Sequence, residues 1–223
     1  FNFEGDEFSF FKKLKVNQES KYNAFIQFGN CSILSISPEL FFKIEKNRIT
    51  VKPMKGTIRR FGIDEIDSRK IEFLKSDEKT KSENLMIVDL LRNDLGKISK
   101  EGSVKVKKLF EIEKYKTLFQ MTSTIESELK KGIRFFDIIK AIFPSGSVTG
   151  APKIRSMEII RELEKEERKI YTGSIGFILP DGFSIFNVSI RTVLLENGKG
   201  ELGVGGGIVV DSNPIKEWNE AKL

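Results

Sequence analysis

The sequence predicts an α+β fold with mainly antiparallel sheets and helices on their outer faces. Alternating apolar and polar residues, typical of strands, are grouped into blocks at 22–54, at 104–127 and from 170 onward. Segments with apolar residues three and four apart, typical of helices, lie between these blocks. Strict alternation of strand and helix would favour a parallel sheet, so the grouping favours antiparallel pairing.

The first block is expected to form consecutive short strands joined by turns. Its turn signals are Gly29-Asn30 and Lys46-Asn47. The second block is expected to form a pair of strands. The last strand-rich segment contains three apolar stretches, which are YTGSIGFIL, FSIFNVSIRTVLL and GELGVGGGIVV.

Helices are expected between and after these blocks. Residues 64–95 have the helical period, and two helices ending at a Gly96 cap are expected there. The final helix should begin after Asn213, with Pro214 in its first turn. Two further helices are expected at 135–142 and 151–166.

The composition excludes several classes of site. The chain has 223 residues, one cysteine (Cys31) and no histidine, so disulfides, zinc fingers and His-based catalytic dyads are excluded within it. The 38 basic and 32 acidic residues are interspersed, which argues against a nucleic-acid partner. No apolar stretch has the length of a membrane span and no signal peptide is evident, so we expect a cytoplasmic protein of one domain, 1–223, without a membrane partner.

A carboxylate and a lysine form the first candidate site. Ser37-Pro38-Glu39 interrupts two strongly apolar strands and places a carboxylate between them. Lys55 follows one hairpin later, so strand pairing could bring both side chains to the same end of a sheet. The alternatives are an exposed Glu39 and an ordinary surface ion pair.

Acidic residues on two predicted helices form the second candidate site. Glu83 shares a helical face with Ile87 and Leu90, so it lies beside the apolar stripe. Glu217 and Glu220 project from one face of the last helix, a spacing that suits oxygen ligation of a hard cation. A solvated amphipathic face is the alternative.

Two further features could bind an anion. The glycines at 203, 205, 206 and 207 would allow close backbone approach and expose amide donors. In NVSIRTVLL a period of two puts Asn187, Ser189 and Arg191 on one face, and an arginine there can bind a carboxylate. The alternative for the glycines is a bulge in a strand. The alternative for Arg191 is a cross-strand salt bridge.

In order along the chain, these segments resemble the chorismate-utilising enzymes, the family of anthranilate synthase component I, aminodeoxychorismate synthase component I, isochorismate synthase and salicylate synthase. The resemblance implies an anthranilate synthase component I-like α/β sandwich. Because the family is typically longer, we expect residues 1–223 to form a chorismate-binding catalytic domain that lacks N-terminal strands. The matching blocks are SPELFF, PMKGTIRR, SENLMIVDLLRNDLG, QMTSTIE, FPSGSVTGAPKIRSMEII, YTGSIGF, NVSIRT, GVGGGIV and EWNEAKL.

Within this family, a lysine before Gly-Thr is the mark of aminodeoxychorismate synthesis, and this chain has Lys55 there. The resemblance therefore implies conversion of chorismate and ammonia to 4-amino-4-deoxychorismate, toward p-aminobenzoate and folate. The ammonia would come from a glutamine amidotransferase subunit. Anthranilate synthase component I and a non-catalytic chorismate-binding remnant are the alternatives.

The resemblance also implies residue roles. Lys55 would be the covalent nucleophile and Glu39 the general acid and base. Mg²⁺ would be bound by Glu83 and Glu220, with Glu217 as a ligand or beside one. At Gln120 many relatives carry histidine, so an acid or base role there is in doubt. The expected substrate-binding residues are Thr57, Thr149, Gly150, Lys153, Tyr171, Arg191, Gly203, Gly205, Gly206 and Gly207.

Overall fold

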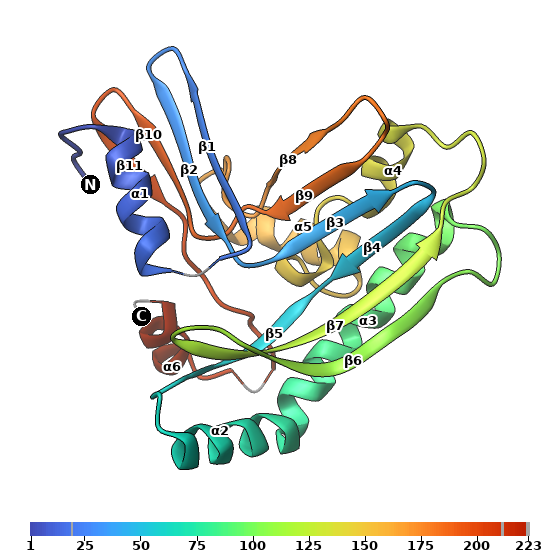
Figure 1. Ribbon diagram of the computed structural model, residues 1–223. Helices are drawn as coiled ribbons and strands as arrows, with labels where there is room; N and C mark the ends of the chain where they lie inside the picture. The colour runs from blue at the N-terminus through green and yellow to red at the C-terminus, as the bar shows by residue number, and fades with distance from the viewer. Residues whose placement is uncertain (19, 211, 222–223) are drawn as a thin grey trace.

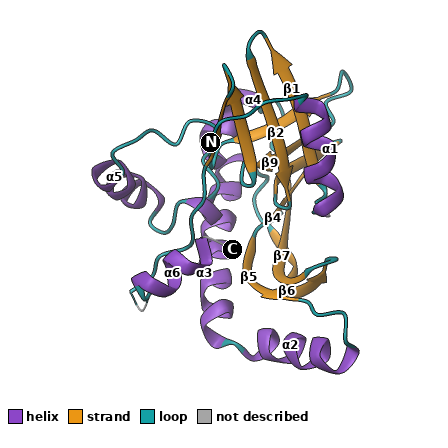
Figure 2. Cartoon of the chain, turned by 90° about the vertical axis from the view of Figure 1, so that its left-hand side faces the viewer, coloured by secondary structure: helices purple, strands orange, loops and turns teal. Residues whose placement is uncertain are grey.

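A computed structural model describes residues 1–18, 20–210 and 212–221, without the side chains of Lys216 and Glu220. It contains two sheets in which all strand pairs are antiparallel, and some of the helices lie against them (Figures 1 and 2). The predicted α+β class is confirmed.

The smaller sheet has four strands in the order β1-β2-β10-β11. Helix α1 (Glu7–Asn17) packs on this sheet, and Phe11 contributes to a small core with side chains from β2 and β10. Asp6 caps the helix by accepting a hydrogen bond from the backbone N–H of Ser9 (2.7 Å). The strands are β1 (Tyr22–Phe28), β2 (Cys31–Ser37), β10 (Thr192–Glu196) and β11 (Lys199–Leu202).

The larger sheet has seven strands and is built around the long strand β7 (Leu118–Glu128). Strands β4 (Arg48–Lys52) and β5 (Met54–Arg59) pair with successive parts of β7, and β6 (Lys105–Lys114) also pairs with it. The remaining strands, β3 (Leu40–Glu45), β9 (Ser184–Val188) and β8 (Ser174–Ile178), extend the sheet beyond β4.

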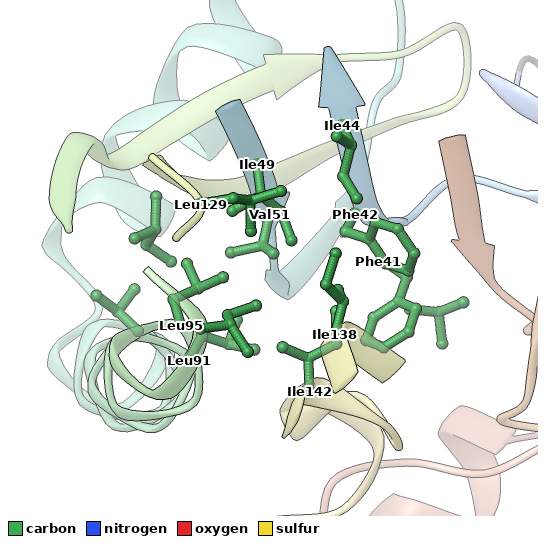
Figure 3. Close-up of a cluster of buried hydrophobic side chains, with 14 of the residues drawn as sticks. Phe41, Phe42, Ile44, Ile49, Val51, Leu91, Leu95, Leu129, Ile138 and Ile142 are labelled. Atoms are coloured by element: carbon green, nitrogen blue, oxygen red, sulfur yellow. The ribbon is translucent and has the colours of Figure 1, made fainter. Parts of the chain in front are cut away.

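The main core lies between the larger sheet and two helices, α3 (Glu78–Ile98) and α4 (Phe135–Ile142) (Figure 3). Leu91 and Leu95 of α3 face Ile49 and Val51 of β4, and all four are almost fully buried. This packing fixes α3, and therefore Glu83, relative to the sheet. The other helices are α2 (Asp64–Ser76), the short 3₁₀ helix η1 (Gly146–Val148), α5 (Lys153–Leu163) and α6 (Pro214–Ala221).

Most predicted elements are present, including both turns of the first block. Helix α6 begins as expected, because the Asn213 side chain accepts from the N–H of Ile215 (3.1 Å). Helix α1 was not predicted. The Gly96 cap was wrong: α3 continues to Ile98, because Leu95 and Ile98 both pack into the core and hold the last turn.

Two strand predictions were wrong in ways that matter for the site. NVSIRTVLL is two strands, β9 and β10, because the chain leaves the larger sheet at Val188 and enters the smaller one at Thr192. Arg191 lies at this crossing with a φ of 51°, so the expected shared face with Asn187 and Ser189 does not exist. Likewise β11 ends at Leu202, and the following glycine-rich segment is a loop.

Among the described residues, no helix combines the length and the apolar character that a membrane crossing requires.

Candidate functional site

Glu39 is a buried carboxyl group at the corner between β2 and β3. Its residue is 4% exposed, and its Oε1 atom is buried without a hydrogen-bond partner among the described residues. Burial raises the pKa of Glu39 to about 7, although the Ser147 hydroxyl, the charge on Lys55 and the backbone of Met54 partly offset it. Near neutral pH both forms are populated, as a general acid and base requires.

Lys55 is partly buried on β5, where it pairs with Met121 of β7. Its positive charge acts on Glu39, so the two side chains share one electrostatic environment. Its amine also lies close to the glycine-rich loop: a β-carbon at Gly207 would be 3.1 Å from Lys55 Nζ. The predicted convergence of Glu39 and Lys55 is therefore present.

The glycine-rich loop, residues 203–207, passes close to three candidate side chains. A β-carbon at Gly203 would overlap the Tyr171 ring, and one at Gly205 would be 2.8 Å from its hydroxyl oxygen. At Gly206 it would be 3.3 Å from a carboxylate oxygen of Glu217. The missing side chains of these glycines thus let the backbone lie directly against these groups.

Arg168 also contacts Tyr171, since its guanidinium carbon lies over the ring, 5.9 Å from the ring centroid. Arg168 also donates to the backbone oxygen of Val148 (3.2 Å), the last residue of η1. Burial raises the pKa of the Tyr171 hydroxyl. The hydroxyl therefore stays protonated near neutral pH and can donate a hydrogen bond.

Arg191 lines a cavity of about 200 Å³. One of its guanidinium nitrogens donates to the side-chain oxygen of Gln18 (3.1 Å), and burial lowers the pKa of the group. Pro38, which precedes Glu39, and Gln120 also line this cavity, together with Tyr115, Lys116, Thr117 and Leu118. An arginine in such a cavity is suited to bind a carboxylate.

Three other predicted substrate residues lie on β5 and on the segment between η1 and α5. Thr57 is exposed on β5 and pairs with Gln120 across the sheet. The Thr149 hydroxyl donates to the backbone oxygen of Ser145 (3.0 Å), which stabilises its own loop. Gly150 has a φ of 141°, and a β-carbon there would be 2.9 Å from the Ser156 hydroxyl. Their roles toward substrate stay predictions.

Lys153 has a structural partner. Its ammonium contacts the buried carboxylate of Asp94 on α3 and donates to the backbone oxygen of Ile142 (3.0 Å). The other oxygen of Asp94 accepts from Lys97 (2.8 Å). This arrangement ties the start of α5 to α3 and the end of α4, and substrate binding by Lys153 stays a prediction.

The expected metal ligands are only partly described. Glu83 and Glu217 are both half-buried, and their carboxylates have the oxygen chemistry that Mg²⁺ prefers. The side chain of Glu220 lies outside the described residues. Among the side chains that are described, no group of three or more acidic, cysteine or histidine residues is close enough to hold a metal ion. The donor set suits the metal, but its assembly stays a prediction.

Two polar residues of the site were not identified from sequence. Ser147 acts on Glu39, and Gln18 binds Arg191. Ser147 lies inside the block FPSGSVTGAPK, so its place there was a usable signal. Gln18 lies in a polar segment before β1 with no pattern that marks it.

The residues brought together can perform acid–base and nucleophilic chemistry on an anionic molecule. A buried carboxyl group that titrates near neutrality lies in the field of a lysine amine, and the amine lies beside a glycine-rich backbone loop. An arginine-lined cavity adjoins the corner that holds the carboxyl group.

Comparison with known proteins gives a consistent result. The family model described as chorismate binding enzyme matches residues 1–223. The chain is 41% identical over 219 residues to aminodeoxychorismate synthase component 1 of Salmonella typhimurium, covering 98% of this chain and 48% of that protein. It is 40% identical over 218 residues to anthranilate synthase component 1 of Aquifex aeolicus, covering 98% and 44%.

A solved structure has the same fold. The crystal structure of anthranilate synthase component I from Streptococcus pneumoniae is 36% identical to the chain and superimposes with a TM-score of 0.89, covering 98% of this chain and 48% of that one. The chain thus spans about half the length of the relatives it matches.

Proposed function

Because the chain belongs to the family of chorismate binding enzymes, we propose that it is the catalytic portion of an aminodeoxychorismate synthase, which converts chorismate and ammonia to 4-amino-4-deoxychorismate. The observation that carries the proposal is the position of Lys55, whose amine lies beside Gly207 and in the field of the buried carboxyl group of Glu39. A displacement through a covalent lysine adduct needs these two groups together.

In the first step, the amine of Lys55 attacks ring carbon 2 of chorismate while the hydroxyl group leaves carbon 4. The ring double bonds shift accordingly, and protonated Glu39 gives its proton to the departing hydroxyl, which leaves as water. A pKa of about 7 keeps a large fraction of Glu39 protonated at neutral pH. General acid catalysis of this kind typically contributes ~10²- to 10⁴-fold in rate.

In the second step, ammonia attacks carbon 4, the double bonds shift back, and Lys55 leaves carbon 2. The Glu39 carboxylate accepts the proton that the new amine releases. Two displacements in succession keep the configuration at carbon 4. The balance is chorismate plus ammonia giving 4-amino-4-deoxychorismate plus water.

Other residues of the site would hold the substrate. Arg191 and Tyr171 would bind the enolpyruvyl carboxylate, since one carries a charge and the other keeps its hydroxyl proton. The amides of the glycine-rich loop would face the ring carboxylate. Thr57, Thr149, Gly150 and Lys153 complete the proposed binding set.

We also propose Mg²⁺ as cofactor, with Glu83, Glu217 and Glu220 as its ligands. When bound, the ion would neutralise the ring carboxylate of the substrate. The support is the chemistry of these side chains and the position of Glu217 beside the glycine-rich loop.

The proposal extends to the setting of the reaction. The name of the Salmonella relative, a component 1, supports a partner component, which we propose is a glutamine amidotransferase that supplies ammonia. The product would be used for p-aminobenzoate and folate synthesis in the cytoplasm.

Anthranilate synthesis is the second candidate function, because a relative with that name is nearly as similar. Incubation with chorismate, Mg²⁺ and ammonium separates the two. We expect 4-amino-4-deoxychorismate, identified by mass spectrometry, without pyruvate release. Fluorescent anthranilate with equimolar pyruvate would contradict the proposal, and chorismate binding without turnover would indicate a non-catalytic remnant.

A further inference from the structure

Gln120 is a buried polar side chain on β7 to which the proposed reaction gives no role. Its strand neighbour Met121 pairs with Lys55, and Gln120 itself pairs with Thr57. Gln120 lines the same cavity as Arg191 and Pro38. It therefore shares one cavity with the proposed carboxylate-binding arginine and with the residue that precedes Glu39.

The carboxamide of Gln120 has an unmet hydrogen bond. The residue is 8% exposed, yet its Oε1 atom is buried without a partner among the described residues. Buried polar atoms in folded proteins are usually paired, so an exception at the wall of a cavity points to a ligand. Rotation about the terminal torsion is easy for glutamine, so the oxygen can turn toward a bound molecule.

The chemistry of the proposed substrate indicates which group donates a hydrogen bond to Gln120 Oε1. A carboxamide oxygen accepts hydrogen bonds and needs a donor. With both carboxylates of chorismate ionised, the 4-hydroxyl is its one donor group. This hydroxyl is on the ring carbon next to the one that bears the enolpyruvyl ether, so a cavity that holds the enolpyruvyl carboxylate at Arg191 brings the hydroxyl close.

We propose that Gln120 is a substrate-recognition residue that accepts a hydrogen bond from the 4-hydroxyl of chorismate while Arg191 holds the neighbouring carboxylate. The assignment rests on the proposed function. A carboxamide does not titrate near neutrality, so this contact is independent of pH and leaves proton transfer to Glu39. Its role is to hold the leaving hydroxyl in position beside that acid.

The test combines a change in the protein with a change in the ligand. Dissociation constants are measured by calorimetry with Mg²⁺ and without ammonia in a Lys55→Ala background, in which the covalent step cannot occur. The background protein and its Gln120→Leu variant are each titrated with chorismate and with the 4-deoxy analogue. Gln27→Leu is the matched control, because Gln27 is an exposed residue of β1 that does not line the cavity. Thermal unfolding of each variant reports its folding.

In the Lys55→Ala background, the protein with Gln120 and its Gln27→Leu variant should bind chorismate about 5- to 10-fold more tightly than the analogue, the net effect of one hydrogen bond. Gln120→Leu should bind the two ligands equally, at an unchanged melting temperature. If Gln120→Leu keeps the full preference for chorismate, the assignment is wrong while the proposed function stands. A background protein that binds neither ligand would overturn both.

Discussion

The amine of Lys55 lies against the backbone of Gly207, close enough that a β-carbon at position 207 would be 3.1 Å from Nζ. The two residues come from distant parts of the chain, β5 and the loop before α6. Their approach places the proposed nucleophile beside three consecutive glycines, 205–207, which have no side chains to obstruct a planar substrate.

Replacing Lys55 tests the covalent step directly. Lys55→Ala and Lys55→Arg should both reduce the formation of 4-amino-4-deoxychorismate by more than about 10³-fold, because neither side chain can act as the nucleophile. Arg keeps the positive charge and so controls for electrostatics. Mass spectrometry of the unaltered protein with chorismate should show an adduct that both variants lack; a variant that retains the rate removes lysine from the mechanism.

Gly207→Ala should obstruct the site without unfolding the protein. The added methyl group would lie against Lys55 Nζ, so we expect at least a tenfold lower kcat at a similar melting temperature. Gly96→Ala is the control: it adds the same group in open space on α3 and should stabilise the protein by about 0.5–1 kcal/mol. Equal activity in both variants would contradict the close approach of the loop.

The burial of Glu39 predicts how stability depends on pH. Its pKa is raised above the unfolded value of 4.5 to about 7, so the folded state binds the proton more tightly. The resulting stabilisation is fully present below pH 4.5 and is lost as the pH rises through 7, by about 3 kcal/mol in total. Glu39→Gln should therefore be more stable than the unaltered protein at pH 8 and similar at pH 4.5.

Urea unfolding across this pH range measures the difference. Glu128→Gln serves as control, because Glu128 is an exposed surface residue and the pKa of its carboxyl is lowered by Lys100. A stability difference for Glu39→Gln that does not change with pH would show that Glu39 ionises normally.

Two lysines, Lys153 and Lys97, bind the carboxylate of Asp94, and replacing them should reduce the stability of the protein by different amounts. Lys153→Met removes the buried positive charge beside the Asp94 carboxylate, which is only 3% exposed. We expect this to lower the free energy of unfolding by about 3 kcal/mol. Lys97→Met removes an exposed partner of the same carboxylate and should cost less than about 1 kcal/mol. Chemical denaturation measures both, and equal costs would refute a buried structural pair.

Metal removal tests the proposed ligands. Chelation of Mg²⁺ should abolish product formation, and Glu83→Gln or Glu217→Gln should raise the Mg²⁺ dissociation constant by about tenfold or more, because each removes a charged oxygen ligand. Glu128→Gln, on the surface at the end of β7, should leave it unchanged. Calorimetry with Mg²⁺ measures binding separately from activity, and unaltered affinity in both variants would remove these residues from the metal site.

Local patterns in the sequence were enough for the strands of the first two blocks, for the presence of two helices within 64–95 and for the start of α6. These elements follow from alternation, helical spacing and the Asn213 cap, which depend on neighbouring residues. The first helix was missed although Asp6 and the apolar residues after it carried a signal. The end of α3 was misplaced because packing of Ile98 outweighed the preference of Gly96 for a helix end.

For the site, the sequence by itself determined the residue types and their order, and the resemblance they carry determined the family and the expected pairing of Glu39 with Lys55. Only the tertiary structure decided that Arg191 lies at a crossing between two sheets, that the glycines form a loop against Tyr171, Glu217 and Lys55, and that Lys153 binds Asp94. These arrangements join residues far apart in the chain. Burial, charge pairing and close backbone approach arise only when the chain has folded, so a pattern of neighbouring residues does not contain them.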